Sequence, residues 1–168
     1  MNPIVSAGLT IGVLCGLWTF VMGFTGWYKD PAKVNIFFVV VLIEIAGLIW
    51  GLRKTAERGR TYSGQVVAGS LMAIIAGVVI MGFSLFFTTV LFPDYFQELA
   101  VLQEEQLRQA GKSEAEIRST LDAAAPFRRP LMNAAMGFLG TFMTGVIVSA
   151  IVGIWISARG PRLGSARI

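Results

Sequence analysis

One acidic residue lies in a segment where a charge is costly. Glu44 is the single charged residue between Val34 and Leu52. An ionised carboxylate in the middle of an apolar span is expensive, so such an acid is a functional candidate by default. We expect Glu44 to be protonated at neutral pH and hydrogen-bonded to a hydroxyl or a backbone carbonyl.

Three threonines are candidate partners for Glu44. Matching the depths of the apolar segments brings Thr19, Thr141 and Thr144 level with the acid, together with Cys15. No Lys or Arg lies at that depth. Glu44 and these threonines could form a proton or cation site of a small transporter. Alternatively, they could form a structural contact between helices. Transport normally needs a relay or a coordinating cluster, so a lone acid favours the structural interpretation.

The remaining chemistry is sparse. The 168 residues include no histidine and one cysteine, Cys15. Imidazole-based nucleophilic catalysis, His-ligated haem and His-containing zinc sites are therefore excluded, as is an intrachain disulfide. Neither a phosphate-binding loop nor a G-x-S-x-G motif is present. We expect no catalytic residues, no cofactor and no metal site, and therefore no enzyme activity.

The composition places these residues in a membrane protein. Apolar types make up 55% of the chain and charged types 14%, and the mean hydropathy is +0.68. An ordinary soluble domain carries roughly 25% charged residues. Long uncharged stretches must be helical in lipid, because only a helix satisfies its own backbone. We predict an all-α membrane protein with four transmembrane helices at about residues 4–28, 34–52, 63–92 and 131–158.

Residues 93–130 form the one long polar connection. Apolar residues recur there at three- and four-residue steps, and Ser113 stands three residues before Glu116, the spacing of a capping box. We predict a short extramembrane helical hairpin between the third and fourth spans. It is either a docking surface or lid, or a pair of helices lying on the bilayer interface.

Small residues recur every fourth position within the spans. They are Gly8, Gly12 and Gly16 in the first, Gly47 and Gly51 in the second, Gly69, Ala73 and Gly77 in the third, and Gly137, Thr141, Gly145, Ser149, Gly153 and Ser157 in the fourth. Helices associate in lipid by close backbone approach, which such stripes allow. The stripes face either neighbouring helices of the same chain or another protomer.

Basic residues suggest an orientation. Four crossings put both termini on the same side of the membrane. That side also has the basic residues of a short loop and of the C-terminal tail: Arg53, Lys54, Arg58 and Arg60, and Arg159, Arg162 and Arg167. Equal numbers of basic residues lie on the other side, but these lie mainly in a longer connection. Short basic segments face the cytoplasm, so we expect cytoplasmic termini. The expected partner is the lipid bilayer, with a second copy or another membrane protein as candidates. No basic stripe with interleaved aromatics supports nucleic-acid binding.

Several short motifs occur in a fixed order along nearly the whole chain. They are Asn2-Pro3-Ile4-Val5, Arg53-Lys54, Tyr62-Ser63-Gly64-Gln65, Phe92-Pro93-Asp94-Tyr95-Phe96, and Gly111-Lys112-Ser113-Glu114-Ala115-Glu116-Ile117. Their order and spacing resemble the bacterial domain-of-unknown-function family 4199. The resemblance implies a small inner-membrane protein of four helices. It implies no activity and no catalytic residues, and Glu44 has no assigned place in the family pattern.

Three functions follow as expectations. The first is a non-enzymatic, self-associating or accessory scaffold subunit of the bacterial inner membrane. The second is a small proton-linked transporter or channel that uses Glu44. The third is a binding module in which Tyr95, Phe96 and the acidic connection hold a ligand or lipid outside the cytoplasm.

Overall fold

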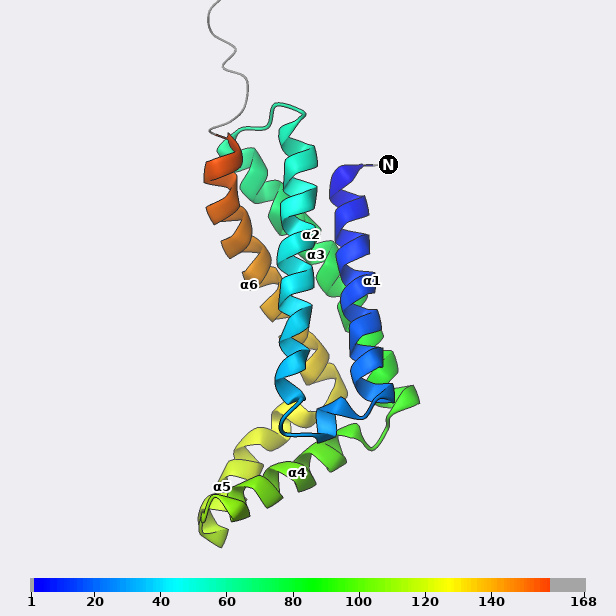
Figure 1. Ribbon diagram of the computed structural model, residues 1–168, viewed down its shortest axis with the longest axis vertical. Coiled ribbons are helices and arrows are strands. Elements are labelled where there is room, and N and C mark those ends of the chain that lie inside the picture. Colours follow the sequence, from blue (N-terminus) through cyan, green and yellow to red (C-terminus); the bar gives the residue numbers. More distant parts are fainter. Residues whose placement is uncertain (1, 158–168) are drawn as a thin grey trace, which may run out of the picture.

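The computed structural model describes residues 2–157, and these form helices with short connections and no strand (Figure 1). The α-helices are α1 (Pro3–Phe24), α2 (Val39–Ala56), α3 (Tyr62–Phe86), α4 (Tyr95–Gln109), α5 (Glu114–Ala124) and α6 (Pro130–Ser157). Short 3₁₀-helices lie between them at η1 (Trp27–Lys29), η2 (Val34–Phe38) and η4 (Ala125–Arg128). A π-helical turn, η3 (Phe87–Leu91), continues α3.

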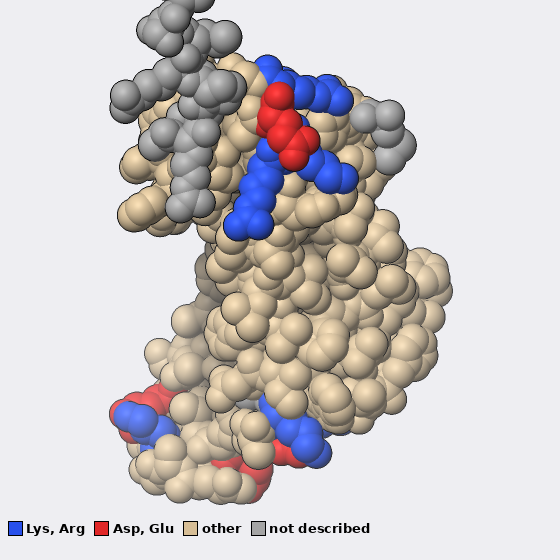
Figure 2. All heavy atoms as spheres, turned by 45° about the horizontal axis from the view of Figure 1, so that its top comes forward, with Lys and Arg blue, Asp and Glu red and all other residues tan. Residues whose placement is uncertain are grey.

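Within residues 2–157, four helical stretches are long and apolar enough to cross a membrane. They are Pro3–Phe24, Asn35–Ala56, Tyr62–Leu91 and Pro130–Ile156. The shortest have 22 residues, about 33 Å of helix against a hydrocarbon core of about 30 Å. Figure 2 shows a broad uncharged belt between two charged ends. The predicted all-helical chain with four candidate membrane spans is therefore confirmed, and the architecture is that of a multi-pass membrane protein.

The first two spans end elsewhere than predicted. The first was expected to reach residue 28, but α1 ends at Phe24, because Gly26 adopts a left-handed φ of 69°. The second was expected to stop at residue 52, but α2 continues to Ala56. Its basic last turn remains helical while Lys54 reaches back over the ring of Trp50, 4.0 Å from the centroid.

The other two spans lie close to their predicted ranges. Helix α3 starts at Tyr62, and its π-helical continuation ends at Leu91. Helix α6 starts at Pro130 and is described to Ser157. Residue 158, the predicted end of the last span, lies outside the described residues.

Small residues set the contacts between helices. On the face of α1, a side chain at Gly8, Gly12 or Gly16 would collide with Ile75, Val79 or Phe83 of α3. Between α3 and α6, Gly69 meets Ser149, Gly145 meets Ala73, and Gly77 meets Phe138. Gly47 and Gly51 of α2 meet Ile11 and Ala7 of α1, and Gly153 lies beside Tyr62. These small residues therefore face neighbouring helices of the same chain and not another protomer.

Gly137 departs from the predicted stripe. A Cβ there would meet no atom within 4 Å, and the same is true of Gly140 and Gly82. Gly137 therefore faces away from α3, while Thr141, Gly145, Ser149 and Gly153 are buried. The side chain of Ser157 is outside the description.

The bundle has an aliphatic and an aromatic region. Ile11, Leu48, Leu52 and Met72 are almost completely buried and form the centre of the aliphatic core. Towards the other end of α1, rings pack in series: Phe20, Phe83, Phe87, Phe92, Tyr28 and Tyr95. The second region joins α1 and α3 to the start of α4.

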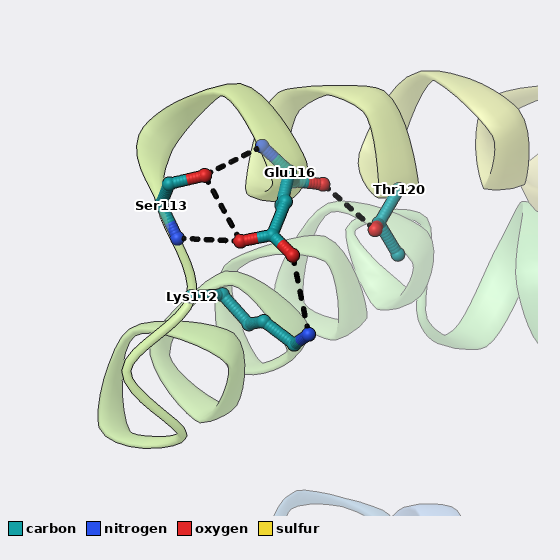
Figure 3. Close-up of polar contacts among 4 residues, drawn as sticks. All are labelled: Lys112, Ser113, Glu116 and Thr120. Atoms are coloured by element: carbon teal, nitrogen blue, oxygen red, sulfur yellow. Dashed lines mark hydrogen bonds and ion pairs between the residues drawn. The ribbon is translucent and has the colours of Figure 1, made fainter.

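Helices α4 and α5 extend beyond the four long helices at the lower end of Figure 1. A turn with Gly111 at φ 73° separates them. The predicted capping box at α5 is confirmed (Figure 3): Ser113 Oγ accepts from the Glu116 amide at 3.3 Å, and the Ser113 amide donates to Glu116 Oε2 at 3.0 Å. The bond from the Ser113 amide, a second bond from the Ser113 hydroxyl to Glu116 Oε2 at 2.9 Å, and the 3.2 Å ion pair with Lys112 lower the pKa of Glu116.

Candidate functional site

Glu44 lies in the interface between α1 and α2. Its side chain is 5% exposed. One turn before it, the carbonyl of Val40 accepts a weak hydrogen bond from Cys15 Sγ at 3.7 Å. One turn after it, Gly47 lies against Ile11. The antiparallel helices thus enclose the acid between the levels of Ile11 and Cys15.

The carboxyl group of Glu44 is not satisfied by the threonines expected to surround it. Glu44 Oε1 is buried and has no hydrogen-bond partner among residues 2–157. The Thr19 hydroxyl donates to the Cys15 carbonyl of its own helix at 3.2 Å, as hydroxyls in helices commonly do. Thr141 is buried and Thr144 half-buried, and neither supplies a partner to Oε1. The expected hydrogen bond from a threonine to this oxygen is absent.

Trp18 is a further buried polar group of α1, which was not singled out from the sequence. Its Nε1 is buried and has no partner in the described part of the chain. The residue follows Cys15 by three positions, so the two side chains project from one face of α1. Its position in mid-span, away from the interfacial belt favoured by tryptophan, was the available signal.

A second buried polar contact joins α2 to α3. Thr55 and Gln65 are 1% and 0% exposed. The Thr55 hydroxyl lies 2.6 Å from Gln65 Oε1 and 2.9 Å from the Leu52 carbonyl, so it donates to one of these two acceptors. Gln65 Nε2 has no partner in the described residues. The pair is a hydrogen-bonded contact between two uncharged side chains.

A third polar group attaches α4 to the connection between α1 and α2. Glu98 accepts hydrogen bonds from the Tyr28 hydroxyl and from Lys29 Nζ, the latter at 2.7 Å. The bond from Lys29, followed by that from Tyr28, lowers the pKa of Glu98. Burial, and then the contact with Glu98, raises the pKa of Tyr28. The Tyr28 ring also lies 5.0 Å from that of Tyr95, so this attachment has both a polar and an apolar part.

No cluster of three or more His, Cys, Asp or Glu side chains that could hold a metal ion occurs within residues 2–157. Two features stand out. One is the Glu44 carboxyl group, which has a buried oxygen without a hydrogen-bond partner. The other is the segment of residues 93–130, named the outer segment here, which Glu98 attaches to Tyr28 and Lys29.

The family comparison covers the spans, the outer segment and all three polar groups. A family described as "Protein of unknown function (DUF4199)" matches residues 6–157. The chain belongs to the DUF4199 family. The resemblance seen in the order of the motifs is therefore confirmed. No curated protein and no solved structure matches the chain. Membership in DUF4199 adds no activity to the membrane helix bundle described above.

Proposed function

We propose that this DUF4199 protein is a non-enzymatic scaffold of the bacterial inner membrane that associates with itself through α6. The exposed face of α6 around Gly140 carries the proposal. Gly137 and Gly140 have open space around them, and the neighbouring Met136 and Met143 are 47% and 50% exposed. Small residues let helices approach closely in lipid, where no hydrophobic drive brings them together.

The outer segment supports the role of a scaffold. In the proposal, residues 93–130 form a helical hairpin outside the lipid on the side opposite the termini. The bonds of Glu98 to Tyr28 and Lys29 hold α4 in a defined position. Arg128 donates to Gln103, which joins the end of this segment back to α4.

The proposed orientation has cytoplasmic termini. The last turn of α2 and the loop after it carry Arg53, Lys54, Arg58 and Arg60 beside one acid, Glu57. Short basic loops near span ends remain on the cytoplasmic side. The tail residues Arg159, Arg162 and Arg167, used in the same argument, lie outside the described residues.

Disulfide crosslinking tests the α6 contact. Cys15 is the one native cysteine, so Cys15→Ala provides a cysteine-free background. In that background, Met136→Cys in native membranes should give a crosslinked dimer on mild oxidation. Leu17→Cys on the exposed face of α1 is the control and should give none. Adding Gly140→Leu should remove the Met136→Cys crosslink, because the bulky side chain keeps the helices apart. Equal crosslinking at both sites, or none at Met136→Cys, would refute the proposal.

A second function is favoured by Glu44 Oε1, which is buried without a partner. Leaving a buried polar atom unsatisfied costs about 1–3 kcal/mol, and exchange of a proton is one use for such an acid. In this alternative the protein is a small proton-linked transporter or channel. Liposomes with an internal pH dye would show proton flux that Glu44→Gln abolishes and the exposed Glu57→Gln does not. Equal flux in wild type and Glu44→Gln would remove this alternative.

A further inference from the structure

A groove opens between the last turns of α2 and α6. Its volume is about 270 Å³, and its lining residues are Ile49, Arg53, Val152, Trp155 and Ile156. Four of the five are apolar, and Arg53 is the one charged group in the wall. The Trp155 side chain is 68% exposed, so the groove opens sideways from the bundle.

The groove lies at one end of the uncharged belt. Arg53 and Lys54 in the last turn of α2 and Arg58 and Arg60 just after it form one basic segment, named the basic loop here. Figure 2 shows basic side chains around a single acidic one at its upper end. The ion pairs among residues 2–157 all lie at the opposite end, between residues 29 and 116. The basic loop therefore has no acidic side chain of the described chain bound to it.

We propose that this groove binds one anionic phospholipid, with an acyl chain against the apolar wall and the phosphate at Arg53. A guanidinium presents a planar set of donors that matches phosphate oxygens. Basic pockets between membrane helices near the cytoplasmic surface suit anionic head groups, and each Arg or Lys near that surface adds attraction. The apolar wall offers nothing to a free anion, and a zwitterionic lipid would leave the excess positive charge of the loop uncompensated.

A second copy of the chain fits this groove less well. A symmetric contact here would bring two basic loops together, and like charges brought together oppose association. The lipid site is also separate from the proposed self-association face, because Gly140 precedes Val152 by more than three turns of α6. The two proposals can therefore fail independently.

Brominated lipids provide the test, because bromine quenches nearby tryptophan fluorescence. The full chain is reconstituted in phosphatidylcholine vesicles containing increasing brominated phosphatidylglycerol, and brominated phosphatidylcholine serves as the reference lipid. We expect preferential quenching by the anionic lipid, which Trp155→Phe should largely remove. Arg53→Gln should weaken the preference roughly tenfold, the effect of losing one charge-assisted hydrogen bond to the phosphate.

The control is Arg58→Gln, which removes the same charge from the same loop without touching the groove. It should alter the preference much less than Arg53→Gln. Arg53→Lys, which keeps the charge without the planar donors, should be intermediate and covers the case in which Arg53→Gln does not fold. Equal quenching by both lipids, or equal effects of Arg53→Gln and Arg58→Gln, would overturn the proposal. Displacement of the lipid by soluble glycerol phosphate would also overturn it, since the site would then hold a free anion.

Discussion

The substitution Gly145→Ala should move α6 away from α3, with which it is in close contact. A Cβ at Gly145 of α6 would overlap the Cβ of Ala73 on α3. Ala73 has no rotamer with which to move aside, and one turn further along Gly69 lies against Ser149 in the same way. The clash can therefore be relieved only by moving α3 and α6 apart.

The cost follows from the geometry. Unbonded carbons rest at about 3.5–4.0 Å, so the helices would need to move roughly 1.5 Å apart at this level. Such overpacking costs about 1–3 kcal/mol. The same change at Gly140 meets no atom within 4 Å. Gly140→Ala should be neutral or stabilising by up to about 1 kcal/mol, because alanine is the better helix former.

Unfolding in detergent distinguishes the two variants. Tryptophan fluorescence at a high ratio of detergent to protein, where chains are separate, gives the free energy of unfolding of each. Gly145→Ala should be clearly less stable than Gly140→Ala. Adding Ala73→Gly to Gly145→Ala should restore much of the loss, since the double-mutant cycle then measures one contact. If Gly145→Ala were as stable as Gly140→Ala, the close packing of α3 on α6 would be refuted.

Two further predictions concern the outer segment. Ser113→Ala removes a helix cap worth about 1 kcal/mol, so hydrogen exchange in the first turn of α5 should become several-fold faster, whereas the exposed Ser119→Ala should change little. Lys29 and Tyr28 lower the pKa of Glu98. The attachment of α4 should therefore be fully present above the ordinary carboxyl pKa of about 4.3, and it should be lost as the pH falls through the lowered pKa of Glu98. Protease sensitivity of α4 between pH 3 and 7 should show this transition in wild type and not in Glu98→Gln; a transition of equal size in Glu98→Gln would assign it to another group.

The sequence determined the features that depend on neighbouring residues. Four apolar runs predict four spanning helices because each helix satisfies its own backbone in lipid. The capping box of Ser113 and Glu116 was equally readable, since both partners lie within one turn. Helix ends were less accurate: hydropathy alone did not show that Gly26 ends α1 before the aromatic pair that follows it.

Only the tertiary structure decided which face meets which neighbour. Helical spacing places Glu44, Gly47 and Gly51 on one face, but it does not give the rotation and tilt of the helices packed against that face. Depth-matching therefore brought threonines level with Glu44 although none bonds to its buried oxygen.

Contacts between segments that are distant in the sequence could not be predicted from the sequence either. Tyr28 and Glu98 are 70 positions apart, and α2 and α6 meet at a groove whose walls come from residues 49–53 and 152–156. Residues so far apart carry no shared periodicity. Their contact exists only once the bundle has brought its helices together.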